Sequence, residues 1–485
     1  MFVGALGLAL NAAAQTVTIL HTFSSSSTNG NQCYARLVQG SDGNFYGTTE
    51  IGGSAGVGAV FRISPSGVYT NLYSFASTFT GDGWQPLAGL VQGSDGNFYG
   101  TTSAEGTNTC QCGNVFRISP SGSYTNLHYF SGLTNDGSTP RAALVQGSDG
   151  NFYGTTTRGG SGTGGGGVVF RISPGGSYTN LYSFPGYSHD GYSPIGALVQ
   201  GSDGNFYGTT SNGGTNSYGT VFRINPSGSY TNLHSFAGGY YQGNNEGQHP
   251  YGPLVQGSDG NFYGTTAGGG GTANGAGTVF RIGPSGSYTT LYSFSNSPPD
   301  GAQPEAGLVL GSDGNFYGTT YGGGTNICGC GTVFRISPSG QYKTLYSFSA
   351  LGTGEPVAGL VQGSDGNLFG TTLGEVFKMA ASLPSPANQM NGVSVAGTNV
   401  VITVASVAGE TYQLQYATGL SSGNWSNVPE ASVTNSMGGP LTVTNVGGAV
   451  PGGALLPVGD HTIGGGAWET GFGQSDGAGR MVFTL

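Results

Sequence analysis

The side chains best suited to chemistry are acids that recur in a D-G-x-x-P motif. Carboxylates bind Ca²⁺ and could bind the hydroxyl groups of a glycan, and two of them together can cleave a glycosidic bond as acid and base. The structural alternative is that the acid caps a turn, as Asp before Gly commonly does. Asn29 and Gly352 occupy the equivalent position in the first and last copies, and the five acids are Asp82, Asp136, Asp190, Glu246 and Asp300.

Aromatic side chains in the same variable stretches would offer flat surfaces for stacking against a ligand. The candidates are Trp84, Tyr192, Tyr240, Tyr241 and Tyr321. We predict that these aromatics and the acids form a ligand-binding face with no catalytic residues and no cofactor. Ca²⁺ at Asp82, Asp136 or Asp190 is an alternative. The sequence contains no serine nucleophile elbow, H-E-x-x-H motif or phosphate loop.

Four of the five cysteines form two C-x-C pairs, Cys110 with Cys112 and Cys328 with Cys330. The pairs lie in equivalent glycine-rich stretches of two distant repeats, so they cannot supply four converging ligands to one zinc ion. We expect each pair to close locally as a disulfide in an oxidising compartment, with free thiols as the alternative. Cys33 is left over and is expected to be a free thiol.

A repeat of about fifty residues organises the chain. The block G-S-D-G-N occurs seven times, with its Asp at positions 42, 95, 149, 203, 259, 313 and 365. Each repeat predicts four short strands, as in 87–93, 97–102, 115–119 and 124–130. Asp95-Gly96 predicts a two-residue type I′ hairpin, and Pro120-Ser121-Gly122 predicts a second turn. Four antiparallel strands without a helix predict the blade of a β-propeller, and seven repeats predict seven blades.

The two ends of the repeat region complement each other. The third strand of the repeat occurs seven times, whereas only six copies of the fourth strand follow, because the last repeat stops at Val376-Phe377-Lys378-Met379. The missing copy lies at the start of the chain, where Val17 to Phe23 (VTILHTF) matches the fourth-strand sequence YTNLYSF. We therefore predict that the N-terminal strand completes the seventh blade, which removes the exposed edge of an open ring.

Each third strand carries one cation, and we expect it to pair with the hairpin Asp of its own or the neighbouring blade. Such pairs contribute only ~0–1 kcal/mol each when exposed. These cations account for more than half of the 12 Lys and Arg residues: Arg62, Arg117, Arg171, Arg223, Arg281, Arg335 and Lys378.

The repeat L-V-Q-G-S-D-G-N-F-Y-G-T-T…G-T-V-F-R-I resembles the tandem GloVer repeat of exported bacterial proteins over about residues 15–379. The portion D-G-N-F-Y-G-T is also similar to D-G-N-x-W-x-G-T, the repeat of sensor-kinase type propellers. The resemblance implies a propeller, export and often a C-terminal surface anchor. It implies no established activity and no catalytic residues.

The segments outside the repeats predict a further module and export. Residues 1–14 resemble a signal peptide that lacks its basic region, with a hydrophobic first strand as the alternative. Residues 380–391 read as a linker, and the alternating strands of 392–446 resemble a small fibronectin-like β-sandwich. The glycine-rich residues 447–485 predict no fold. A net charge of −10 argues against nucleic acid or anionic lipid as the partner, and no later apolar run could span a membrane.

These features together predict an all-β, secreted or cell-surface protein. The leading hypothesis is a non-enzymatic binding or structural protein that contacts a glycan or an extracellular protein through its variable loops. One alternative is a glycosidase or lyase that uses the rim carboxylates, which would need two of them ~5–9.5 Å apart. The other alternative is a building block of the cell surface or of a filament. Ligand identity, anchoring and oligomeric state are not determined by the sequence.

Overall fold

The computed structural model describes residues 16–380, apart from 24–28, 77–80, 105–109, 111, 134, 162–163, 187–188, 239–244, 273–274, 327 and 350–353. Beyond these it describes the backbone of the strands within 5–9, 390–396, 399–406, 411–417, 426–434, 439–444 and 481–484. The chain divides into two compact units, Val17–Ala381 and the combined segments Met1–Thr16 and Ser382–Leu485. Among the described residues, no helix is long and apolar enough to cross a membrane.

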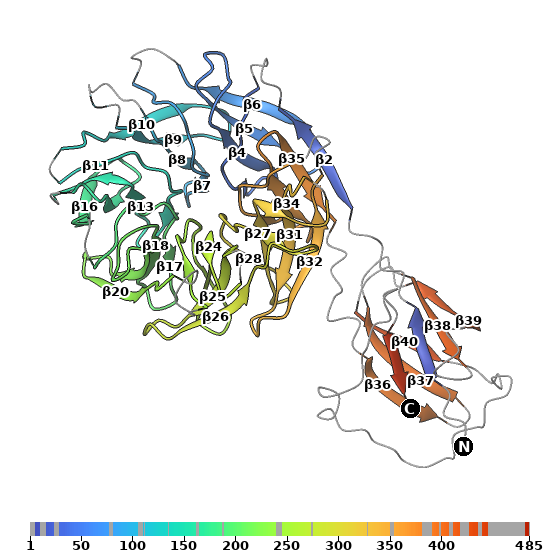
Figure 1. Ribbon diagram of the computed structural model, residues 1–485. Coiled ribbons are helices and arrows are strands. Elements are labelled where there is room, and N and C mark those ends of the chain that lie inside the picture. Colours follow the sequence, from blue (N-terminus) through green and yellow to red (C-terminus); the bar gives the residue numbers. More distant parts are fainter. Residues whose placement is uncertain are drawn as a thin grey trace. The chain divides into compact units, whose positions relative to one another are not determined.

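Seven antiparallel sheets of four strands form the ring of the larger unit, as predicted (Figure 1). The first strands of blades one to seven are β3 (Val38–Gln39), β7 (Val91–Gln92), β12 (Val145–Gln146), β17 (Val199–Gln200), β22 (Val255–Gln256), β28 (Val309–Leu310) and β33 (Val361–Gln362). The second strands are β4 (Phe45–Thr49), β8 (Phe98–Thr102), β13 (Phe152–Thr156), β18 (Phe206–Thr210), β23 (Phe262–Thr266), β29 (Phe316–Thr320) and β34 (Leu368–Thr371).

The outer half of each blade consists of the third and fourth strands. The third strands are β5 (Ala59–Ile63), β9 (Asn114–Ile118), β15 (Val168–Ile172), β19 (Thr220–Ile224), β25 (Thr278–Ile282), β31 (Thr332–Ile336) and β35 (Glu375–Met379). The fourth strands are β6 (Tyr69–Ser74), β10 (Tyr124–Tyr129), β16 (Tyr178–Ser183), β20 (Tyr230–Ser235), β26 (Tyr288–Ser293), β32 (Tyr342–Ser347) and β2 (Val17–Thr22). Figure 1 shows β7, β17 and β28 toward the centre of the ring and β6, β10, β20, β26 and β32 at its periphery.

The seventh blade closes with the N-terminal strand, as predicted. β2 pairs antiparallel with β35, with Val17 opposite Met379, Ile19 opposite Phe377 and Thr22 opposite Glu375. The sheet order is β2-β35-β34-β33, so residues from both ends of the repeat region share one blade. No open sheet edge is left between the first and last repeats, and the ring is continuous.

The core lies between neighbouring blades and is built mainly from aromatic residues. The second-strand Tyr of one blade stacks on a Phe of the next, as Tyr46 does on Phe98 with ring centroids 3.9 Å apart. Further out, a fourth-strand ring stacks on the first Tyr of the next fourth strand, as Tyr73 does on Tyr124 at 4.5 Å. His21, His128 and His234 take this Tyr position and stack in the same way, so packing explains these histidines.

The hairpin between the first two strands differs from the predicted type I′ turn. In blade two, Gly96 has a φ of +81°, whereas Asp95 is absent from the described residues with positive φ. The amide of Gly96 donates to the carbonyl of Gly93 at 2.9 Å, and the amide of Gly93 donates to that of Asn97 at 2.8 Å. This is a three-residue loop with a left-handed glycine, in which only the glycine needs positive φ.

The expected ion pairs between third-strand cations and hairpin aspartates form only in blade seven among the described residues, where Lys378 Nζ lies 3.0 Å from Asp365 Oδ2. The prediction is wrong for the six arginines. The hairpin Asp is already occupied: Asp95 accepts from Asn97 Nδ2 at 2.7 Å and from the Tyr99 hydroxyl at 2.8 Å. Tyr99 lies opposite Arg117 in the pairing of β8 with β9. The Tyr99 hydroxyl therefore occupies the position beside Asp95 where we expected the Arg117 guanidinium.

The second unit contains two antiparallel sheets. One has the order β36-β37-β40, from β36 (Met390–Ala396), β37 (Asn399–Ser406) and β40 (Gly439–Thr444). The other has the order β39-β38-β1-β41, from β39 (Ser426–Thr434), β38 (Thr411–Ala417), β1 (Ala5–Ala9) and β41 (Met481–Thr484). β1 and β41 come from the predicted signal peptide and the predicted foldless tail. The strand β1 agrees with the alternative that the first segment is a hydrophobic strand. Cleavage of residues 1–14 as a signal peptide and the fibronectin-like fold of residues 392–446 stay predictions.

Candidate functional site

Two sets of loops share one face of the ring. Antiparallel strands place the loop between the second and third strands (the glycine-rich loop) at the same end of the blade as the loop that enters it from the preceding blade (the entry loop). The two loops are paired by short strands in three blades, β11 (Gly137–Ser138) with β14 (Arg158–Gly159), β21 (Gly247–Gln248) with β24 (Gly268–Gly269), and β27 (Gly301–Ala302) with β30 (Gly322–Gly323). We call this side of the ring the loop face.

The five predicted rim acids lie in the entry loops and bond to their own turns. Asp82 is 7% exposed and accepts from the Tyr73 hydroxyl at 2.7 Å and the Ala76 amide at 3.0 Å. Asp300 is 6% exposed and accepts from the amide and hydroxyl of Ser295 at 2.7 and 2.8 Å. Asp190 accepts from Tyr182, and Glu246 accepts from the Ala237 amide.

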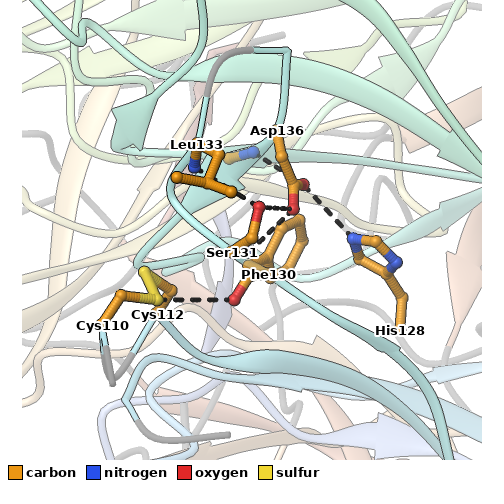
Figure 2. The surroundings of a disulfide bond; sticks show 8 residues. Cys110, Cys112, His128, Phe130, Ser131, Leu133 and Asp136 are labelled. Carbon is orange, nitrogen blue, oxygen red and sulfur yellow. Dashed lines mark hydrogen bonds and ion pairs between the residues drawn. A yellow bond between two sulfur atoms is a disulfide. The ribbon is translucent and has the colours of Figure 1, made fainter. Parts of the chain in front are cut away.

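Asp136 shows the same arrangement in detail (Figure 2). Its carboxylate accepts from the amide and hydroxyl of Ser131, both at 2.7 Å, and lies 3.3 Å from His128 Nε2. Burial opposes ionisation, but these hydrogen bonds to His128 and Ser131 outweigh it and lower the pKa of Asp136 to about 2. The acids thus cap turns, which is the structural alternative. Among the described residues, no group of three or more His, Cys, Asp and Glu could hold a metal ion.

The predicted aromatic residues separate into different environments. Trp84 and Tyr192 form backbone bridges to Ala104 and Asn212 in the adjacent glycine-rich loops. The indole nitrogen of Trp84 is buried and has no hydrogen-bond partner. Tyr240 and Tyr241 lie outside the described residues. Tyr321 lies nearer the axis, where its amide donates to the carbonyl of Gln303 at 3.0 Å.

Both predicted disulfides are formed, between Cys110 and Cys112 and between Cys328 and Cys330, while Cys33 is free and buried. Figure 2 shows the first disulfide beside the turn that carries Asp136, with Cys110 Sγ 3.6 Å from the carbonyl oxygen of Phe130. The second lies in the same way against Phe348. Each disulfide therefore closes within one glycine-rich loop and lies against the start of the entry loop that leaves its blade.

The entry loops bring a polar residue to the start of each first strand in a left-handed conformation. Its φ lies between +54° and +61° in all seven blades. In the second to seventh blades its amide donates to a carbonyl in the preceding glycine-rich loop, as Glu355 does to Cys330 at 3.1 Å. One blade's loop thus fixes the next blade's residue at the axis. The seven are Gln32, Gln85, Thr139, Ser193, His249, Gln303 and Glu355.

Two residues further on, in the segment that leads into each first strand, the side chain varies from blade to blade, and only tyrosine occurs twice. The residues on either side of this position are buried: Cys33 and Ala35, for example, flank Tyr34, which is 40% exposed. Three of the seven residues here are aliphatic, and the seven are Tyr34, Leu87, Arg141, Ile195, Tyr251, Glu305 and Val357.

Charged and aromatic residues from these positions interact across the axis. Burial and the carboxylates of Glu50, Glu355 and Glu305 raise the pKa of Tyr34. These four residues therefore lie close enough to interact although they come from three blades, the first, sixth and seventh. Arg141, Tyr251 and Tyr321 interact with members of this group. We call the seven residues together the axial cluster: Tyr34, Glu50, Arg141, Tyr251, Glu305, Tyr321 and Glu355.

The electrostatics of the axial cluster favour binding of a polar ligand. Burial raises the pKa of Glu50, and Arg141 opposes this rise. Burial also raises the pKa of Glu305. The pKa of Tyr251 is raised first by burial and then by the charge of Glu305. Glu355, followed by burial, raises the pKa of Tyr321. Partly desolvated acids, an arginine and tyrosines offer both donors and acceptors to hydroxyl groups.

A separate pocket of about 910 Å³ lies at the edge of blades five and six, lined by Tyr292, Asp300, Asn326 and Thr344 among others. Its polar groups are largely bonded within the protein. Thr344 Oγ1 donates to the Pro299 carbonyl, and Asn326 Nδ2 donates to the carbonyls of Ser347 and Phe348. This pocket offers a ligand fewer free donors and acceptors than the axial cluster does.

Sequence reasoning found Tyr321 and missed the other members of the axial cluster. The signal is present in the repeat itself. Within Q-P-x-A-G-L-V-Q the position x varies from repeat to repeat, whereas it is preceded by Pro in six of seven repeats, followed by Ala or Gly in all seven, and followed at the third and fourth positions by Leu-Val in all seven. A uniform scaffold with one variable position directed at a common axis is the pattern of a site.

A model of the Gloeobacter/Verrucomicrobia repeat matches residues 78–246 and 239–383, which is more than half of the chain. No curated protein shows significant similarity.

The solved structures that this chain resembles are distant in sequence. Two are described as extracellular domains of hybrid two-component systems of B. thetaiotaomicron. They are 11% and 12% identical, both with a TM-score of 0.49, and the matches cover 88% and 89% of this chain but 53% and 59% of those chains. The chain thus spans little more than half their length. A protein described as a 6-phosphogluconolactonase from Bacteroides uniformis is 14% identical, with a TM-score of 0.42, over 83% of this chain and 100% of its own.

Proposed function

Because the chain belongs to the Gloeobacter/Verrucomicrobia repeat family, whose propeller carries no catalytic motif here, we propose that it is an extracellular, non-enzymatic binding protein. Its ligand, a glycan or an extracellular protein, is contacted on the loop face at the axial cluster. The observation that carries this proposal is the contrast between a nearly sevenfold scaffold and one position that holds six different residue types in seven blades.

The axial cluster replaces the rim acids as the centre of binding. The rim carboxylates are engaged by their own turns, so a ligand would have to compete with hydrogen bonds such as that from Tyr73 to Asp82. Tyr34, by contrast, is 40% exposed and lies near three carboxylates. Tyrosine rings and carboxylates are suited to sugar rings and their hydroxyl groups.

A carbohydrate-active enzyme is the second candidate function, and its catalytic acids would be those of the axial cluster rather than the rim carboxylates. Burial raises the pKa of both Glu50 and Glu305, which is what a general acid requires. The extracellular location is supported by the two disulfides, which persist in oxidising compartments.

The test is a glycan array followed by calorimetry with the full chain. Tyr34→Ala and Tyr251→Ala should each weaken binding about ten-fold or more, whereas Trp84→Ala at the outer loops should leave it unchanged. Loss of binding in Trp84→Ala alone would place the site at the outer rim and contradict the proposal. Release of shorter products from a bound glycan, abolished by Glu305→Gln, would favour the enzyme instead.

A further inference from the structure

One cation stands alone below the axial cluster. Arg36 follows Tyr34 by two residues and is exposed, while Ala35 and Leu37 on either side are buried, so it points to the same axis. The equivalent position holds only small or ring-closed residues in the other blades: Gly89, Ala143, Ala197, Pro253, Gly307 and Gly359. Arg36 is therefore the single long side chain at its level of the ring.

The Arg36 side chain reaches across to the seventh blade. Its Cδ lies 3.7 Å from the place where a Cβ on Gly359 would be. A side chain at Gly359 would thus touch the arginine stem, and the glycine keeps the space open. Arg36 as a whole is exposed, although its side chain approaches the seventh blade and its pKa is lowered by burial.

The charge of Arg36 is not balanced within the described residues. No acidic oxygen there lies within ion-pair distance of it, in contrast to Lys378, which pairs with Asp365 at 3.0 Å. Burial lowers the pKa of Arg36, and no carboxylate acts against that effect. Because no acidic side chain among the described residues pairs with Arg36, an anionic group of a ligand could pair with it without displacing an existing ion pair.

We propose that Arg36 binds the carboxylate of a uronic acid residue at the end of an acidic glycan, which enters the axis from the loop face. This inference rests on the proposed function and names its ligand class. The planar guanidinium presents two parallel donors that match a carboxylate.

The surroundings of Arg36 favour a sugar over a peptide C-terminus as the source of the carboxylate. Tyr34 lies two residues before Arg36 and is also exposed, and a pyranose ring can pack against a tyrosine ring. Glu305 and Glu355 at the mouth accept hydrogen bonds, and a sugar ring donates from several hydroxyls at once. The net charge of −10 disfavours long polyanions, so one terminal carboxylate, rather than a highly charged chain, suits this site.

The experiment uses the full chain and an array of oligosaccharides that end in glucuronate or galacturonate, each with its neutral glucose or galactose counterpart. Affinities of the best pair are measured by calorimetry for the wild type, Arg36→Gln, Arg36→Lys and Arg158→Gln. Arg158 is an exposed arginine on the same face but away from the axis, which makes it the matched control. Thermal melting confirms that each variant is folded. The tripeptide Ala-Ala-Ala, with a free or amidated C-terminus, tests the other source of a carboxylate.

We expect the uronate-ended oligosaccharide to bind at least about ten-fold more tightly than its neutral counterpart. Arg36→Gln should remove this preference, Arg36→Lys should keep part of it, and Arg158→Gln should leave it intact. Equal binding of both sugars, unaffected by Arg36→Gln, would overturn the inference while the proposed function stands. Arg36-dependent binding of the free tripeptide alone would overturn the sugar as the source. If no glycan bound, both this inference and the glycan form of the proposed function would fall.

Discussion

Truncating Phe23 to Ala tests whether the closing strand holds the ring as firmly as an interior blade does. Phe23 is 6% exposed, and its ring centroid lies 4.8 Å from His21, 5.4 Å from Phe61 and 5.9 Å from Tyr69. Phe130 in blade two is fully buried and has the same three contacts, with His128, Phe170 and Tyr178 at 5.0, 5.3 and 6.0 Å. Removing a buried Phe ring costs about 3–5 kcal/mol.

Since the two environments match, Phe23→Ala and Phe130→Ala should lower the free energy of unfolding by the same amount, within about 1 kcal/mol of each other. Urea denaturation followed by fluorescence measures both, and Val68→Ala at a 68% exposed position should change little. A loss for Phe23→Ala several-fold smaller than for Phe130→Ala would show that β2 is only loosely attached. The closure of the ring, and the shared axis that it creates, would then be refuted.

Other predictions address the turns and the thiols. Asp136 has a pKa lowered to about 2, so its contribution of about 2 kcal/mol is present above pH 4 and lost as the pH falls through 2; Asp136→Asn should flatten that part of an acid-denaturation curve. Gly96→Ala should cost about 1 kcal/mol because φ is +81° while the space is open, whereas Gly100→Ala should cost more because its Cβ would lie 2.6 Å from Phe116, as urea titrations would show. A thiol reagent should find no reactive cysteine in the native protein, because Cys33 is buried, burial raises its pKa and the other four cysteines are paired. After denaturation without a reductant it should find one, Cys33. Three or more reactive thiols would contradict the disulfides.

The fold was predictable because the features that build a blade recur at a fixed period. The sequence has seven third strands but only six fourth strands after them, which predicted that β2 completes the seventh blade. The pairing of Val17 with Met379 confirms this prediction. Local chemistry was less predictable. Asp95-Gly96 fits a type I′ turn by composition, yet the loop includes Ser94 as well, so one positive φ is enough. Sequence alone does not show how many residues of a hairpin lie outside its ladder.

The candidate site was harder to predict from the sequence for a related reason. A search for repeated acids finds residues such as Asp82, which recur because every blade needs the same turn cap. Residues that bind an asymmetric ligand differ from blade to blade, so they interrupt the repeat. Arg36 and Glu305 occupy ordinary first-strand positions, and only the ring brings them to a common axis.

The loops that differ most between blades also control this axis. The glycine-rich loops of the first six blades offer a carbonyl to the residue that leads into the next first strand, as Cys330 does to Glu355 and Cys112 does to Thr139. Both disulfides therefore support the residue that enters the following blade, and Cys330 supports a member of the axial cluster directly. Changes in loop length could alter the mouth of the axis while the uniform hairpins on the opposite face keep the blades in place. Changes in these loops would thus alter the proposed binding site without changing the ring.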